Sequence, residues 1–140
     1  AVAIAQGTTS RMVVFGGNNA QQSFNSVHVL EKQNGQWKWS HPTVSGTKPA
    51  ARTGHAAIVG RDGTTICVYG GWDPNEDEDS ILGDCFYLDT KSWQWKEGRK
   101  LDGRVGHKVV RLEDQAWVFG GRIPGDSFTG DVLSLPTADT

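Results

Sequence analysis

The most distinctive group of reactive side chains lies in the run Trp72-Asp73-Pro74-Asn75-Glu76-Asp77-Glu78-Asp79, which has five acids and an aromatic in eight residues. Carboxylates at this density could dock a basic peptide or a basic patch on another protein. The same composition also suits a solvated, mobile insertion, because runs of like charge commonly serve solubility. Both interpretations stay open. The first assigns to partner binding the residues Trp72, Asp73, Asn75, Glu76, Asp77, Glu78 and Asp79.

A calcium site is a weaker interpretation of the same run. Asp73, Asn75, Asp77 and Asp79 alternate as the oxygen ligands do in an EF-hand loop. That loop needs glycine at its sixth position, where this sequence has Glu78, and a helix on each side, which is not expected here. No metal or cofactor is therefore predicted.

Arginine and histidine side chains supply the remaining candidates. Four arginines could receive an acidic partner, namely Arg52, Arg99, Arg104 and Arg122. Two of them belong to a recurring Arg-x-Gly-His motif, Arg52 to His55 and Arg104 to His107, which favours internal hydrogen bonding. We therefore assign only Arg99 and Arg122 to partner binding. The recurrence also favours a role at strand starts for both motif histidines, in place of metal binding or catalysis.

Two further marks recur along the chain. A glycine pair follows a valine and an aromatic at Val14-Phe15-Gly16-Gly17, Val68-Tyr69-Gly70-Gly71 and Val118-Phe119-Gly120-Gly121. The copies are spaced by 54 and then 50 residues (70 − 16 and 120 − 70). Trp-x-Trp occurs at Trp37-Lys38-Trp39 and Trp93-Gln94-Trp95. Three marks in one order with one period indicate a repeat array.

Short strands are predicted between the marks. A first strand of small and β-branched residues follows each histidine, as at 56–59 and 108–110, and a second ends at each glycine pair, as at 65–69. Third strands are expected at 27–30, 86–88 and 132–135. Fourth strands carry the tryptophans, with one buried face. Asn34-Gly35 and Asp62-Gly63 are turn signals. Eleven strands are expected in all.

The order of these residues resembles the kelch repeat, most closely from Pro49 to Trp95, and the resemblance covers nearly the whole chain. The Trp-x-Trp endings are similar to kelch proteins of the host-cell-factor and Rab-effector type. The resemblance implies an all-β propeller segment of four-stranded antiparallel blades. Two blades are complete and a third has three strands, with boundaries at 1–41, 50–97 and 104–140.

A closed propeller needs typically four to eight blades. The resemblance therefore implies a fragment of a parent with six or seven blades. A homo-oligomer that completes the ring is the alternative.

Binding in kelch proteins usually uses the loops between second and third strands and the loops between blades, which here are 18–25, 72–83, 122–130, 41–52 and 98–104. The resemblance implies a protein-interaction module that binds another protein or a peptide, of basic character if the acidic run is the contact. The chain is not expected to be an enzyme. The alternative is a kelch-fold enzyme similar to galactose oxidase, the mutarotases or the specifier proteins. A copper oxidase would need a cross-linkable Cys–Tyr pair together with further Tyr and His ligands, and only Tyr69 and Tyr87 are present, both expected in strands.

Composition excludes other partner classes. The formal net charge of −2 offers no basic footprint for nucleic acid or an anionic membrane. No apolar run approaches the roughly 20 residues that span a bilayer. Only Cys67 and Cys85 are present, and no glycosylation acceptor occurs, which favours a reducing, cytoplasmic setting.

Overall fold

A computed structural model describes residues 1–77 and 80–137, which form fourteen strands and contain no helix. The first sheet is antiparallel and has its strands in sequence order: β1 (Val2–Gln6), β2 (Thr9–Phe15), β3 (Val27–Gln33) and β4 (Gln36–Ser40). The second has the same order, with β6 (Ala56–Val59), β7 (Thr65–Tyr69), β8 (Asp84–Asp89) and β9 (Gln94–Lys100). The short strand β5 (Ser45–Gly46) pairs in parallel with β9 at its outer edge.

The third sheet has three strands, β10 (Lys108–Leu112), β11 (Gln115–Phe119) and β14 (Val132–Leu135). Between the last two the chain forms a small hairpin, β12 (Arg122–Ile123) and β13 (Ser127–Phe128). The prediction of two four-stranded blades and a three-stranded one is confirmed. The two-residue strands β5, β12 and β13 were not predicted, because they are too short to leave a pattern.

Local turn chemistry explains how adjacent strands are joined. Asn34 and Gly35 both have positive φ, 51° and 81°, which matches the right-handed twist of the strands they connect. The Oδ1 of Asp62 accepts hydrogen bonds from the backbone N–H groups of Thr64 and Thr65, and closes the turn before β7. Both turns lie where the sequence predicts them.

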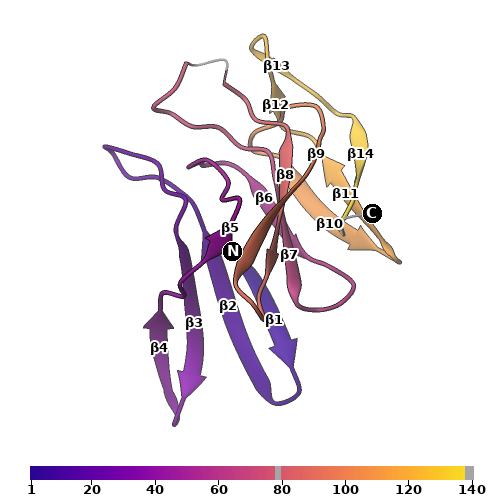
Figure 1. Ribbon diagram of the computed structural model, residues 1–140. Coiled ribbons are helices and arrows are strands. Elements are labelled where there is room, and N and C mark those ends of the chain that lie inside the picture. Colours follow the sequence, from indigo (N-terminus) through magenta and orange to yellow (C-terminus); the bar gives the residue numbers. More distant parts are fainter. Residues whose placement is uncertain (78–79, 138–140) are drawn as a thin grey trace.

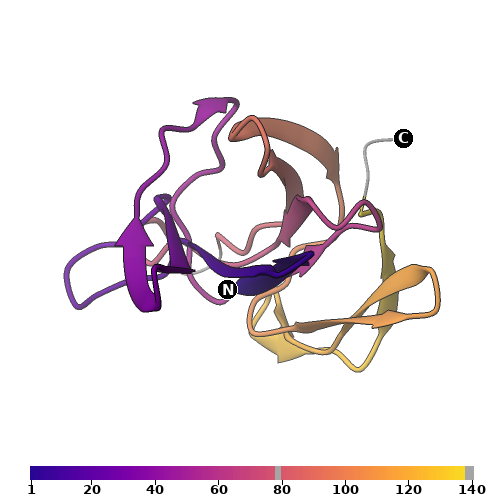
Figure 2. The same cartoon turned by 90° about the horizontal axis from the view of Figure 1, so that it is seen from below.

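The sheets are arranged radially around their first strands (Figure 2). β6 contacts both β1 and β10, so the first strands of the three sheets lie together at the centre. Strand β4 and the β9 edge lie on the outside, as expected for the strands that carry the tryptophans. This is the arrangement of propeller blades.

Hydrophobic cores lie between neighbouring sheets. The first joins Val13 and Phe15 of β2 to Val68 and Trp95 of the second sheet. The second core joins the opposite face of the second sheet to the third sheet, through Cys67, Tyr69, Cys85, Tyr87, Ala116, Val118 and Leu135. The second sheet is therefore covered on both faces, which explains why its strands are apolar at consecutive positions.

The tryptophan strands differ from each other. Trp95 is buried in the first core, but every residue of β4 is exposed, so the prediction of a buried face is wrong for Trp37 and Trp39. Among the described residues, no preceding sheet packs on β4. Trp93 lies outside β9, in the turn before it, with φ 56°.

Candidate functional site

The loops that the sequence assigns to partner binding converge at one end of the sheets, here called the loop face (Figure 1). It comprises the β2–β3 loop, the described part of the β7–β8 loop and the β12–β13 hairpin. The segments that join successive blades pass between these loops. The backbone N–H of Arg52 donates to the carbonyl of Phe24, and Thr53 forms a β-bridge with Trp72. Neighbouring loops are therefore connected through the backbone.

Arg52 organises the joint between the first two blades. Its side chain is fully buried, and Nη1 and Nη2 donate to the carboxylate of Asp84 at 2.5 and 3.1 Å. Nη1 also donates to the Gly70 carbonyl at 2.9 Å, and Nε donates to the Ala50 carbonyl at 3.0 Å. Buried charges need such complete pairing, so this arginine is committed to internal contacts.

Arg104 occupies the same place in the next repeat with a different set of partners. Its Nη1 donates to the carbonyls of Gly120 and Asp131, while Nε is buried without a hydrogen-bond partner among the described residues. The equivalent carbonyl for Nε would be that of Asp102, which instead accepts the hydroxyl of Tyr69. Phenylalanine stands at this position in the other two repeats, so only here does a hydroxyl compete for the carbonyl.

The motif histidines pack against the preceding blade. His55 lies edge-on to Phe15 with ring centroids 5.3 Å apart, and His107 lies edge-on to Tyr69 at 4.9 Å. The Nε2–H of His107 donates to the Tyr69 carbonyl at 3.0 Å. Burial, as the largest cause, lowers the pKa of both histidines to about 4. Both histidines are therefore neutral at physiological pH, and their contacts are packing contacts within the fold.

The base of the acidic run is fixed to the neighbouring blade. The Ser23 hydroxyl donates to Asp73 Oδ1 at 2.6 Å, and Asn75 donates to the same oxygen through its backbone N–H at 3.0 Å. These bonds, first that from Ser23, lower the pKa of Asp73. Trp72 bridges to Thr53 and Ile81 through its backbone and is only partly exposed. Sequence reasoning did not foresee that Asp73 is used internally.

The tip of the run is more accessible. Asn75, Glu76 and Asp77 are exposed. Glu78 and Asp79, which the sequence assigns to the same binding site, lie outside the described residues. In the part of the chain that is described, no three His, Cys, Asp or Glu side chains form a group that could hold a metal ion.

The two arginines assigned to partner binding are not brought together. Arg122 lies in β12, where its Nη1 pairs with Asp126 at 3.3 Å. Arg99 lies in β9 and not in a loop, and with Arg61 it lines a pocket of about 330 Å³ between the second and third sheets. The structure therefore does not form one basic site from them.

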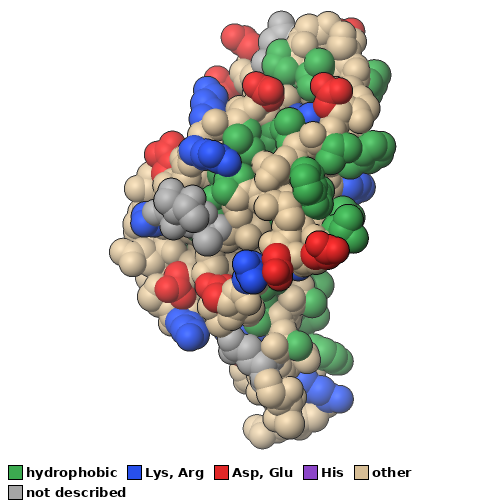
Figure 3. Space-filling model, turned by 90° about the vertical axis from the view of Figure 1, so that its right-hand side faces the viewer, with side chains coloured by type: hydrophobic (Ala, Val, Ile, Leu, Met, Phe, Trp, Pro, Cys, Tyr) green, Lys and Arg blue, Asp and Glu red, His purple; other side chains and the backbone are tan. Residues whose placement is uncertain are grey.

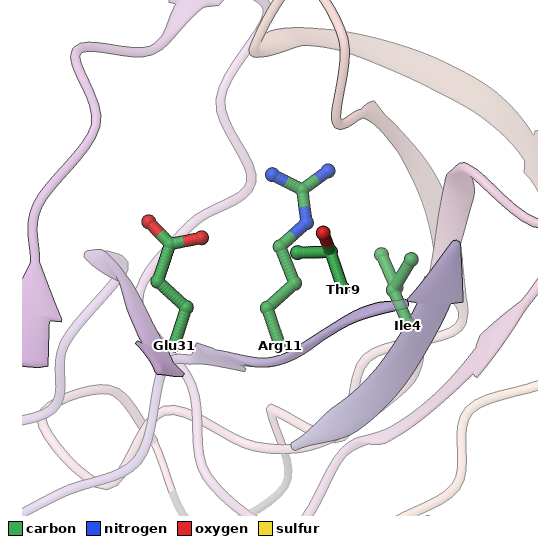
Figure 4. A pocket seen from close by; sticks show the side chains of 4 residues that line it. All are labelled: Ile4, Thr9, Arg11 and Glu31. Atoms are coloured by element: carbon green, nitrogen blue, oxygen red, sulfur yellow. The ribbon is translucent and has the colours of Figure 1, made fainter. Parts of the chain in front are cut away.

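An inter-blade arginine that sequence reasoning missed lies away from the loop face. Arg11, with Ile4, Thr9 and Glu31, lines a pocket of about 200 Å³ (Figure 4). Its Nη2 donates to the carbonyl and hydroxyl of Thr90 at 3.3 and 3.2 Å. Its guanidinium also stacks 5.2 Å from the Trp93 ring. The equivalent positions of the other repeats hold Thr65 and Gln115, so no recurrence marked this residue.

Strand pairing places cysteines opposite tyrosines, which the copper-oxidase alternative requires. Tyr69 pairs with Cys85 and Tyr87 pairs with Cys67. Both tyrosine hydroxyls, however, donate to backbone carbonyls, Tyr87 to that of Pro136 at 2.9 Å. Burial raises the pKa of Tyr69 to about 12, which disfavours the phenolate that a copper ligand would need.

No segment of the described chain forms a helix that could cross a membrane.

Comparisons with known proteins agree with this architecture. The family model of the KLHDC2/KLHL20/DRC7 Kelch-repeats domain matches residues 1–140. Kelch domain-containing protein 3 of Bos taurus is 34% identical over 116 residues, which cover 76% of this chain and 28% of the relative. The Rab9 effector protein with kelch motifs of Gallus gallus is 30% identical over 131 residues, covering 89% of this chain and 33% of the relative.

This chain thus spans about a third or less of the curated relatives it matches. A solved structure titled "Structure of YjhT" superposes with a TM-score of 0.69 at 15% identity, and the match covers 94% of this chain and 41% of that one. At that identity the likeness concerns the fold alone. The repeat marks, the radial sheets and the family match together lead to one conclusion: the chain belongs to the kelch-repeat family of β-propellers.

Proposed function

We propose that this chain is a protein-interaction module that binds a partner protein or peptide at its loop face. One observation carries the proposal: the acidic run is fixed at its base and exposed at its tip. Ser23, Asp73 and the Thr53–Trp72 bridge hold the base, while Glu76 and Asp77 are exposed. A loop whose base is already held in place loses less conformational entropy on binding than a loop with a free base.

The partner surface is proposed to be basic. Asp73 is engaged internally, so the contact is assigned to Asn75, Glu76 and Asp77, with Glu78 and Asp79 next to them in sequence. Carboxylates at an exposed tip attract basic surfaces and steer their approach, and salt weakens this attraction. Arg122 remains a proposed contact at the neighbouring hairpin, although Asp126 competes for it.

The name of one relative favours binding over catalysis. The chicken relative is named as an effector of Rab9, which describes an interaction for that protein. The copper-oxidase alternative is disfavoured, since both tyrosine hydroxyls donate to backbone carbonyls. We also place the chain in a reducing compartment such as the cytoplasm, because Cys67 and Cys85 are both free and buried.

Affinity capture from a cell extract tests the proposal. The wild-type chain is compared with a variant that removes four negative charges without changing side-chain size, namely Glu76→Gln, Asp77→Asn, Glu78→Gln and Asp79→Asn. Asp73 stays unchanged, so that the base of the loop is preserved. We expect the loop variant to capture at least about tenfold less partner protein than the wild type. Capture by the wild type should decrease as the salt concentration rises.

The matched control is Glu113→Gln with Asp114→Asn, two exposed acids in the turn between β10 and β11. It should leave capture unchanged. Equal capture by wild type and the loop variant would refute the acidic tip as the contact. If no protein binds the wild type above an unrelated bait, the interaction-module proposal itself is wrong.

A further inference from the structure

The pocket that Arg11 lines lies at the opposite end of the sheets from the loop face, beside the joint between the first two blades (Figure 4). Its lining residues are Ile4 of β1, Thr9 and Arg11 of β2, and Glu31 of β3. Strand pairing places all four on the face of the first sheet that packs against the second sheet. The pocket is polar, unlike the side of the third sheet, where hydrophobic side chains gather (Figure 3).

The pocket exists because the first sheet extends further than the second at this end. Arg11 lies four residues before the aromatic that precedes the glycine pair, as Thr65 does in the next repeat. Strand β7 begins at Thr65, whereas β2 already begins at Thr9. The last part of the inner face of the first sheet therefore projects beyond the second sheet, and an open pocket of about 200 Å³ results.

Two opposite charges face this pocket without neutralising each other. Arg11 and Glu31 are directly opposite in the strand register, a position where opposite charges commonly pair. Among the described residues, however, they form no ion pair, because Arg11 turns to the second blade. Its Nη2 donates to the carbonyl and hydroxyl of Thr90, and its guanidinium lies over the Trp93 ring. Figure 4 shows both charged side chains pointing into the pocket.

Hydrogen-bonding groups of both side chains remain available to a ligand. Nη1 and Nε of Arg11 donate to no described residue, and neither is among the buried polar atoms that lack a partner, so both are accessible. Glu31 accepts a hydrogen bond at Oε1 from Gln33 Nε2 at 3.0 Å, while no described residue donates to its Oε2. The exposed Thr9 side chain adds a hydroxyl. The pocket thus offers donors on one side and an acceptor on the other.

The two charges restrict which ligand the pocket can hold. A simple anion is attracted by Arg11 and repelled by Glu31, and a simple cation experiences the reverse. A molecule that carries both charges satisfies both groups, and a pocket smaller than the ~300–1,000 Å³ of drug-sized ligands admits only a few heavy atoms. We propose that this pocket binds a small free α-amino acid, with its carboxylate on Arg11 and its ammonium group on Glu31. The pocket is separate from the loop face, so this site is independent of the proposed function.

Nuclear magnetic resonance with L-alanine as the probe tests the proposal. The chain is labelled with nitrogen-15, and the Nε–H of Arg11 and the backbone amide of Thr9 are followed while L-alanine is added. We expect saturable shifts with a dissociation constant on the order of 1 mM, because a ligand of so few atoms gains limited free energy in an open pocket. Acetate and methylamine, which each carry one of the two charges, should bind at least about tenfold more weakly. Shifts that do not saturate by about 20 mM, or equal affinities for L-alanine and acetate, would overturn the proposal.

The Glu31→Gln variant tests the ammonium contact. It removes the negative charge at nearly constant size, and the side chain is only half-buried, so the fold should be preserved. L-alanine should bind at least about tenfold more weakly than to the wild type, whereas acetate should bind more tightly because the repelling carboxylate is gone. Glu97→Gln is the matched control, since Glu97 is an exposed acid of β9 that does not line the pocket, and both affinities should stay unchanged. Undiminished L-alanine binding by Glu31→Gln would place the ligand elsewhere and refute the assignment.

Discussion

Gly70 and Gly120 allow one contact between blades to be measured separately from backbone strain. The two glycines hold the same repeat position and have nearly the same φ, 71° and 69°. A Cβ added at Gly70 would lie 2.6 Å from the Arg104 carbonyl oxygen and 2.7 Å from His107 Cε1. At Gly120 the nearest atom would be the Thr129 carbonyl oxygen, at 3.8 Å. Substitution by alanine therefore imposes the same strain at both sites but a clash at only one.

The expected cost follows from these distances. A residue with a Cβ at left-handed φ lowers the free energy of unfolding by about 1–2 kcal/mol relative to glycine. Gly120→Ala should show this strain alone, because its Cβ meets no close contact. Gly70→Ala places the new Cβ 2.6 Å from the Arg104 carbonyl oxygen, which is closer than Cβ atoms approach backbone in folded proteins. The packing between the second and third blades must therefore open. Overpacking of this kind costs typically about 1–3 kcal/mol more. We expect Gly70→Ala to destabilise by about 2–5 kcal/mol in total.

Urea denaturation followed by circular dichroism gives the free energies of unfolding for wild type and both variants. Equal losses for the two variants, within about 0.5 kcal/mol, would refute the inference that the Arg104–His107 loop packs against Gly70.

Three further outcomes follow from the same joints. Trp95→Ala should lower the free energy of unfolding, measured by urea denaturation, by about 3–5 kcal/mol, because Trp95 is buried. Trp39→Ala should lower it by less than about 0.5 kcal/mol, because Trp39 is exposed, and equal losses would contradict this difference in burial. Arg52→Met should lower the unfolding free energy by about 3–5 kcal/mol, because it leaves a carboxylate without its buried partner, and a neutral result would show that the pair is dispensable. His55 and His107 have pKa values lowered to about 4 from 6.5, so the unfolded chain binds more protons below pH 6.5 and stability falls as pH drops. Between pH 7 and 5 the loss should be about 2 kcal/mol for each histidine, measured as the shift in urea midpoint, and a pH-independent midpoint would exclude their neutral burial.

The acidic run shows why a site is harder to predict than a fold. Its composition marked it as the most distinctive loop, but composition treats its acids as equivalent. The structure separates Asp73, which accepts the Ser23 hydroxyl across the blade boundary, from Glu76 and Asp77, which are exposed. A hydrogen bond between residues 50 positions apart leaves no local pattern in one sequence.

The positions and order of the longer strands were determined by the sequence alone, because turn residues and alternation act over a few neighbouring residues and the period of the glycine pairs places each repeat. Strands β6, β7 and β14 begin and end at the residues predicted for them. The burial of equivalent side chains was decided only by tertiary structure. Trp39 and Trp95 have the same repeat position but opposite exposure, because burial depends on whether a neighbouring sheet covers that face. Likewise, the Tyr69 hydroxyl donates to the Asp102 carbonyl, and Arg104 Nε has no hydrogen-bond partner among the described residues. This arrangement exists only once two blades are packed together.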